Sequence, residues 1–275
     1  MPSNGSATPA QTRSLTFVTT CKGRLEHLRQ TLPLLASQPG TRCIVVDYAC
    51  PDRTADWVET HFPQVRTVRV PEATGFNPSR ARNLGVAAAT SEVICLIDAD
   101  VRIKPGFAAS ILAGFDPRKY YLAAPLIGDI SGTIVCARAA FEFVDGYDEA
   151  CSGWGGEDLD LYERFALHGL RRGGFAANLL DALPHSDALR TTHHAVDKQL
   201  SNSVNLIYSH IKLDLMRLSG NRLPLDYRQR LHAQVHAACV ESRERGTAVR
   251  IEVPYADIEI NFCSMQTCLA YTITL

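Results

Sequence analysis

Val93-Ile-Cys-Leu-Ile-Asp-Ala-Asp100 is an apolar run that ends in two carboxylates. Its length and its β-branched residues predict a buried strand over Val93–Ile97. Apolar runs at Leu15–Thr20, Cys43–Asp47 and Arg66–Val70 predict three earlier strands, and the stretches between them predict helices at Arg24–Leu35 and Ser79–Ala89. Strands that alternate with helices are typical of an α/β fold with a mostly parallel sheet. In such a sheet, ligands bind beyond the carboxyl ends of the strands.

The second half of the chain has a different pattern. We predict a strand at Thr133–Ala137, helices at Glu157–His168, Val196–Leu218 and Asp226–Arg245, a polar loop at Asp181–His194, and a strand-rich tail at Val249–Leu275. Residues 1–13 lack an apolar signal-peptide core and are expected to be a disordered lead. We expect one domain at 14–195, with the C-terminal extension 196–275 packed on it.

Composition narrows the class of protein. The 275 residues are 46% hydrophobic, enough for a full core, and the net charge of −1 gives no indication of a nucleic-acid partner. No stretch approaches the roughly 20 apolar residues of a transmembrane helix. The nine cysteines form no CxxC pair, which favours free thiols in a reducing compartment. We therefore expect a cytoplasmic protein.

Asp98 and Asp100 emerge on the same side of their strand, because strand side chains alternate with period two. Two such carboxylates repel each other unless a cation or hydrogen-bond donors lie between them. A divalent ion with oxygen ligands is one solution, and both residues capping a turn is the other. His185, in Leu183-Pro-His-Ser-Asp187, is a candidate further ligand that would favour manganese over magnesium. A plain surface histidine is the alternative there.

Polar and basic side chains follow the first two strands and open the next helix. Thr19-Thr-Cys-Lys-Gly-Arg24 is a glycine-containing turn whose backbone N–H groups suit phosphate or a base edge. Asp47 ends the second strand, where it could accept a hydrogen bond from a base or ribose. Asn77 is a predicted helix N-cap, and Arg80 could supply a buried guanidinium that pairs with Asp98 or a diphosphate. Ordinary turns and a solvated helix are the alternatives.

Gly153-Trp-Gly-Gly-Glu-Asp-Leu-Asp160 combines three glycines, a tryptophan and three carboxylates just before a helical pattern. Glycines let a backbone come close to a ligand. An aromatic face beside carboxylates suits a sugar, which has apolar C–H faces and a rim of hydroxyls. A carboxylate at a helix start is a candidate general base. Asp160 is expected to be a helix N-terminal charge favoured by the dipole.

In chain order, these pieces resemble metal-dependent glycosyltransferases of the GT-A fold, with a family 2-like first half and a β-1,4-galactosyltransferase-type motif after it. The motifs are Arg24-Leu-Glu-His-Leu28, Phe76-Asn77 with Asn83-Leu-Gly85, Asp98-Ala-Asp100, Gly153-Trp-Gly-Gly-Glu-Asp158 and the downstream His185-Ser186. The likeness covers about residues 15–195 and implies a nucleotide-binding half (14–110) and a half for acceptor and metal (111–195). The chain departs from the family where its second strand ends in Asp47-Tyr48, without a paired Asp-Asp-Gly.

The resemblance implies an inverting hexosyl- or N-acetylhexosaminyltransferase. The donor would be a nucleotide diphosphate sugar, expected to be a UDP-sugar, and the acceptor a hydroxyl of a carbohydrate or another molecule. Asp158 would be the general base, Glu157 would bind sugar hydroxyls, Trp154 would stack on a sugar, and Gly155 and Gly156 would let the backbone approach the donor. The implied donor site comprises Thr19, Arg24, Asp47, Asn77, Arg80, Asp98 and Ala99. Asp100 and His185 would hold Mn2+ or Mg2+.

Two other classes of function fit parts of this pattern. A sugar nucleotidyltransferase also uses a metal and an α/β sheet, but the turn at Thr19–Arg24 only partly matches the loop that it needs. A catalytically silent nucleotide-sugar-binding module would need no complete set of carboxylates, and this chain retains them. The helical pattern at Val196–Leu218 is compatible with internal packing or with a homo-oligomer.

Overall fold

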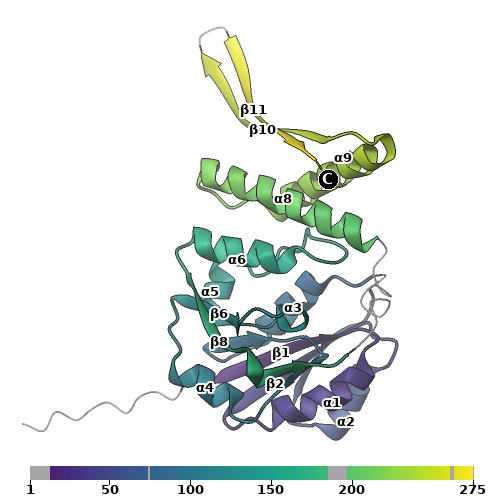
Figure 1. The fold of residues 1–275 in the computed structure, drawn as a ribbon, viewed down its shortest axis with the longest axis vertical. Helices are drawn as coiled ribbons and strands as arrows, with labels where there is room; N and C mark the ends of the chain where they lie inside the picture. The colour runs from purple at the N-terminus through teal and green to yellow at the C-terminus, as the bar shows by residue number, and fades with distance from the viewer. Residues whose placement is uncertain (1–12, 74, 185–196, 261–262, 275) are drawn as a thin grey trace, which may run out of the picture.

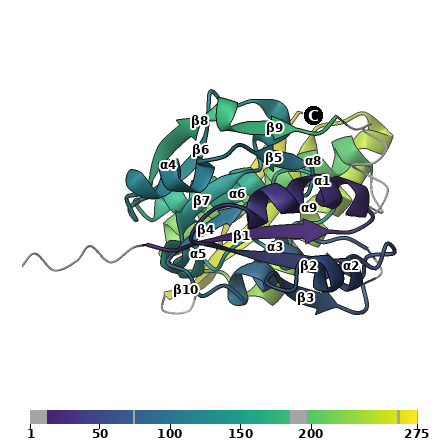
Figure 2. The ribbon, with the colours of Figure 1, turned by 90° about the horizontal axis from the view of Figure 1, so that it is seen from below.

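The computed structural model describes residues 13–184 and 197–274, except 74, 261 and 262. Within this part of the chain, a seven-stranded sheet has the order β3-β2-β1-β4-β7-β6-β8, which Figure 2 shows from bottom to top. Its strands are β1 (Leu15–Cys21), β2 (Thr41–Tyr48), β3 (Arg66–Val70), β4 (Val93–Leu96), β6 (Lys119–Ala124), β7 (Ile134–Ala137) and β8 (Arg171–Ala176). Strand β7 runs antiparallel to both of its neighbours, and the other pairs are parallel.

Helices cover both faces of the sheet. The first face carries α1 (Leu25–Ala36), α2 (Thr54–His61) and α4 (Phe107–Ala113), and the second carries α3 (Pro78–Ala87), α5 (Arg138–Phe143) and α6 (Glu157–Leu167). Neighbouring residues of β1 show the alternation that produces the two cores. Phe17 packs in the cluster of α1, whereas Val18 packs in the cluster of α3.

The C-terminal region forms a further layer on α6. It consists of α8 (Lys198–Ser219), α9 (Leu225–Arg245) and an antiparallel hairpin of β10 (Val249–Ile260) and β11 (Cys263–Ile273). Figure 1 shows α6 between the sheet and α8, with the hairpin projecting beyond α9. A third apolar cluster joins Ala150 and Cys151, which precede α6, to Tyr208 of α8 and Val235 of α9. No helix in the described residues is long and apolar enough to cross a membrane.

The predicted α/β class, with a mostly parallel sheet and C-terminal helices, is confirmed. Strands β6 and β8 were not predicted from the sequence, nor was the small sheet in which β5 (Val101–Ile103) pairs with β9 (Leu180–Ala182). The start of the expected polar loop at Asp181 is therefore a strand. Two short 3-10 turns lie at Gly128–Ile130 and Ala177–Leu179. Residues 1–12 of the predicted lead lie outside the described residues. The division of 14–195 into two halves stays a prediction.

Candidate active site

A cavity of about 410 Å3 opens where β1, β4 and β6 end. The segments after these strands form its walls, and they include Lys22, Asp98 and Leu126. The opposite wall is the glycine-rich segment 153–156 together with the first turn of α6, and Asn202 of α8 also lines the cavity. The cavity therefore lies at the carboxyl edge of the sheet, where a parallel α/β fold is expected to bind its ligand.

The buried guanidinium of Arg82 lies at the centre of the charged groups in this cavity. Its Nη2 donates to Asp98 Oδ1 at 3.0 Å, and its Nη1 donates to Glu157 Oε1 at 3.0 Å and lies 3.6 Å from Asp158 Oδ1. It also lies 4.9 Å from the centre of the Tyr147 ring. Arg82 thus compensates three carboxylates from two elements that are far apart in the sequence.

Asp158 is in the first turn of α6 and lines the cavity. The Tyr147 hydroxyl donates to its Oδ1 at 2.8 Å, which fixes the carboxylate. Burial raises the pKa of Asp158 to about 7; Glu157 and Asp98 act in the same direction and Arg82 opposes them. A carboxylate with a pKa near neutrality is suited to accept a proton from a hydroxyl group.

Gly132 lets two carboxylates converge on one point of the cavity wall. A Cβ at this position would lie 2.9 Å from Asp98 Oδ2 and 3.5 Å from Asp158 Oδ2. The first distance is closer than real Cβ contacts, so any side chain here would displace Asp98. The sequence gives no signal for Gly132, Tyr147 or Arg82 as site residues, because each acts through a contact with residues distant in the chain.

The three glycines of the motif are needed because α8 packs directly on them. Gly153, Gly155 and Gly156 have φ angles of 76°, 87° and 85°, which are strained for residues with a side chain. A Cβ at each would lie within 2.7 Å of a side-chain atom of Ser201, Asn202 or Asn205 respectively. The glycines therefore serve contact with a helix as well as lining the cavity. Their predicted contact with the donor stays a prediction.

Trp154 lines the cavity beside Lys198 of α8, whose Nζ lies 4.3 Å from the centre of the indole ring. The backbone N–H of Trp154 donates to the Ser201 hydroxyl at 3.1 Å. These contacts anchor the tryptophan at the edge of the cavity. Its stacking on a sugar face stays a prediction.

The predicted metal-binding segment is also at the cavity. Asp100 accepts a hydrogen bond from Arg24 Nη1 at 2.6 Å, and Ala99 is buried with its carbonyl accepting from Thr31 at 2.9 Å. His185 lies outside the described residues. Among the residues that are described, no group of three or more histidine, cysteine or acidic side chains is arranged to hold a metal ion.

The other predicted donor residues are placed differently. Thr19 is buried and its neighbour Thr20 lines the cavity. Asp47 accepts hydrogen bonds from the backbone N–H groups of Cys50 and Ala55, both at 2.7 Å, and so acts as the turn residue that was its alternative. Asn77 is the N-cap of α3, as predicted, and accepts from Arg80 N at 2.9 Å. Contacts of Thr19, Asp47 and Asn77 with a nucleoside stay predictions.

Arg80 needs a correction. Its predicted buried guanidinium, which could pair with Asp98 or a diphosphate, is instead exposed, as in the solvated-helix alternative, and Arg82 makes the contact with Asp98. Residues two apart on a helix point to different sides, because one turn takes 3.6 residues. Arg80 therefore faces outward when Arg82 faces the sheet, and any contact of Arg80 with a donor stays a prediction.

Comparisons with known proteins agree with this geometry. The model of glycosyl transferase family 2 matches residues 16–137, and the model described as N-terminal domain of galactosyltransferase matches residues 112–194. A pre-mycofactocin glycosyltransferase of Mycobacterium tuberculosis is 29% identical over 197 residues, which cover 58% of this chain but only 40% of that protein. Human beta-1,4-galactosyltransferase 2 is 29% identical over 107 residues, covering 35% of this chain and 29% of that protein.

Solved structures show the same fold. The mannosyltransferase PcManGT from Pyrobaculum calidifontis, in complex with GDP-Man and Mn2+, has a TM-score of 0.56 at 17% identity and covers 89% of this chain and 79% of its own. S. aureus TarS 1-349 has a TM-score of 0.55 at 13% identity and covers 92% and 96%. The chain therefore has the GT-A fold of these structures. Its first part is family 2-like, and the part that follows is similar to galactosyltransferases.

Proposed function

We propose that this protein is an inverting, metal-dependent transferase that moves a hexosyl or N-acetylhexosaminyl group from a nucleotide diphosphate sugar to a hydroxyl group. One observation carries the proposal: Asp158, with a pKa near 7, lies on the wall of the cavity that also contains Asp98 and Asp100. A proton acceptor and a cluster of acidic groups thus share one site at the carboxyl edge of the sheet. Asp158 comes from α6 and the acidic pair from the segment after β4, and all three line the cavity.

The reaction that these residues support is a single displacement. The acceptor oxygen attacks the anomeric carbon, its proton moves to Asp158, and a new C–O bond forms. The bond from the anomeric carbon to the diphosphate breaks at the same time, and its electron pair leaves with the nucleoside diphosphate. Because attack and departure occur on opposite faces, the configuration inverts. Glu157, held by Arg82, would accept hydrogen bonds from sugar hydroxyls.

The residues of the cavity fit a hard divalent ion. Asp100 offers carboxylate oxygens, the ligands that Mn2+ and Mg2+ accept, and the diphosphate would complete the set together with His185, while Asp98 would contact the nucleoside. Bound there, the ion would supply positive charge that stabilises the leaving diphosphate. Arg24, which contacts Asp100, would orient this carboxylate. A structure similar to this chain contains Mn2+ with GDP-Man, which supports the proposal.

The identity of the donor is tested with a panel of UDP- and GDP-sugars. UDP is favoured by the motifs, while the similar structures include one with UDP-GlcNAc and one with GDP-Man. We expect one sugar nucleotide to raise the melting temperature of the protein in the presence of Mn2+. When an acceptor is added to the protein with this sugar nucleotide and Mn2+, free nucleoside diphosphate should be released. Release of pyrophosphate would instead identify a nucleotidyltransferase. Full transfer in EDTA would contradict the metal assignment, and binding only at millimolar levels across the panel would contradict the function.

The raised pKa of Asp158 predicts a pH dependence of transfer. Only the deprotonated carboxylate accepts a proton, so we expect kcat/KM to rise about tenfold per pH unit below pH 7 and to level off above it. The measurement is kcat/KM from pH 5.5 to 9 at saturating metal, with donor affinity determined at each pH as the control. A profile that stays flat down to pH 5.5 would remove Asp158 from the role of base.

A further inference from the structure

Helix α8 presents a row of buried polar side chains to the segment that precedes and begins α6. Ser201, Asn205, Tyr208 and Lys212 follow one another at spacings of four, three and four residues, so they lie on one side of the helix. All four contact residues between 148 and 160. We call this row the α8 polar row and the segment 148–160 the catalytic loop. The matched family models end at residue 194, before this helix begins.

Asn205 uses its whole carboxamide to hold the catalytic loop. Its Nδ2 donates to the carbonyl oxygens of Ser152 at 3.0 Å and Gly155 at 2.6 Å. Its Oδ1 accepts from the Ser152 N–H at 3.3 Å and lies 2.9 Å from Nε2 of His232. Because two backbone carbonyls face one end and a backbone N–H faces the other, only this orientation of the amide satisfies every partner.

His232 of α9 holds the carboxamide of Asn205 in this orientation. Burial lowers the pKa of His232 to about 4, with His236 acting in the same direction, so the ring is neutral near pH 7. Its Nε2 faces an oxygen that only accepts, so this nitrogen must carry the proton and donate. A chain of hydrogen bonds thus runs from α9 through Asn205 to the glycines of the cavity wall.

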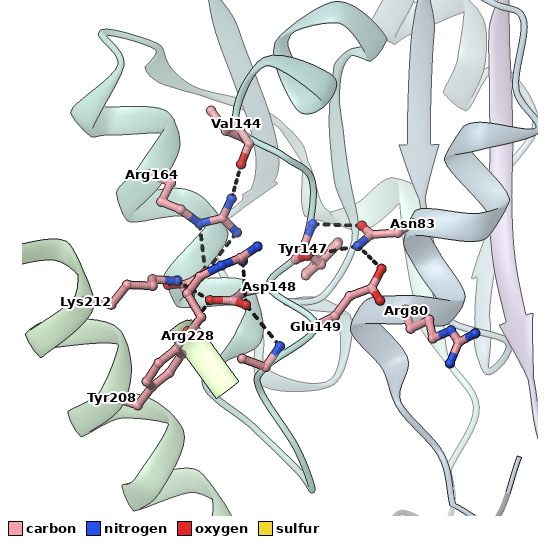
Figure 3. A network of polar contacts seen from close by, with 12 residues as sticks. Arg80, Asn83, Val144, Tyr147, Asp148, Glu149, Arg164, Tyr208, Lys212 and Arg228 are labelled. Carbon is pink, nitrogen blue, oxygen red and sulfur yellow. Dashed lines mark hydrogen bonds and ion pairs between the residues drawn. The ribbon is translucent and has the colours of Figure 1, made fainter. Parts of the chain in front are cut away.

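Lys212 joins the two ends of the catalytic loop. It is completely buried, and its Nζ donates to Asp148 Oδ2 at 2.6 Å and to Asp160 Oδ1. The Tyr208 hydroxyl and Arg228 of α9 also donate to Asp148, both at 2.7 Å (Figure 3). Asp160 lies two residues after Asp158, so the ammonium group anchors the turn of helix that carries the proposed base. This contact also explains Asp160 beyond a charge at a helix N-terminus.

From these contacts we propose that the α8 polar row is the template that positions the catalytic loop, with Asn205 and Lys212 as positioning residues for transfer. The inference rests on the proposed function, because the base that they position is Asp158. Neither residue lines the cavity, so neither touches the substrate. Their removal should change the geometry of the transfer step while leaving contacts on the nucleotide side, such as Lys22 and Arg24, intact.

Asn205→Asp is the sharpest test because it preserves shape. The oxygen that faces Ser152 N–H and His232 remains, whereas the donor to the Ser152 and Gly155 carbonyls is replaced by an acceptor. We expect kcat to fall about 10- to 100-fold, as a displacement near 1 Å would cause, with the donor dissociation constant within twofold of wild type. Asn221→Asp, in the exposed turn after α8, is the matched control and should leave both constants unchanged.

Hydrogen exchange gives a readout that does not depend on activity. In Asn205→Ala, the Ser152 N–H loses its acceptor, so amides of the segment 150–157 should exchange at least tenfold faster while those of β1 do not change. Lys212→Met should accelerate the same segment, whereas Lys104→Met, at an exposed position, should not. Unchanged kcat in Asn205→Asp, or exchange that rises equally throughout the chain, would overturn the template. If the wild type transfers no sugar, the proposed function fails, and local exchange still decides whether α8 orders the loop.

Discussion

Asp158→Asn is expected to lower kcat for sugar transfer by about 10²- to 10⁴-fold, the contribution typical of a general base. The amide keeps the size of the carboxylate, and its oxygen can still accept from the Tyr147 hydroxyl, so the first turn of α6 should remain in place. It can no longer take the proton of the acceptor hydroxyl. Donor binding, measured by thermal shift or calorimetry, should stay within a few-fold of wild type.

Asp226→Asn is a suitable control for this variant. Asp226 also lies in the first turn of a helix, α9, but it is exposed and pairs only with Arg230 among the described residues. Its replacement removes a comparable carboxylate from a helix N-terminus without touching the cavity, and transfer should be unaffected. Transfer by Asp158→Asn at a rate near that of wild type would show that another group, or water, accepts the proton.

Much of the fold could be predicted from the sequence because β1, β2 and β4 are buried strands with apolar runs. Edge strand β3 alternates valine with polar residues and is only half-buried. Strand β8 could not be predicted, since Arg171–Ala176 contains two adjacent glycines and has no apolar run. The glycines have a tertiary cause: a Cβ at Gly173 would lie 2.7 Å from the ring of Tyr121, and one at Gly174 would lie 3.0 Å from Ala124 Cβ, both on the neighbouring strand β6. A residue chosen for a contact with a distant strand gives no local signal.

In the candidate site, too, some residues could be predicted from the sequence and others could not. The motif 153–158 and the pair Asp98 and Asp100 could be found because each contains its chemistry within a few residues. The groups that control this chemistry come from elsewhere, with Tyr147 on the base and Asn205 behind the glycines. A helix pattern at Val196–Leu218 indicates which residues share a face, but not what that face contacts. The buried polar residues of α8 could therefore be assigned to the site only from the structure.

Arg82→Met is expected to have the largest effect on stability, because it leaves Asp98, Glu157 and Asp158 without the cation that they share. Breaking a buried ion pair on one side costs about 3–5 kcal/mol. Asp98 is 41% exposed at its side chain, which lets water compensate part of the loss, so we expect the free energy of unfolding to fall by about 3 kcal/mol. Chemical denaturation monitored by circular dichroism measures this change.

Arg80→Met, two residues earlier on the same helix, is the matched control. Its side chain is exposed, so the free energy of unfolding should change by less than about 0.5 kcal/mol. The two variants also test whether the charge of Arg82 controls the pKa of Asp158. Arg82 lowers the pKa of Asp158, so its loss should shift the pH profile of residual transfer to higher pH, whereas Arg80→Met should not move it. Equal destabilisation by the two substitutions would mean that the cluster around Arg82 contributes nothing beyond helix α3 itself.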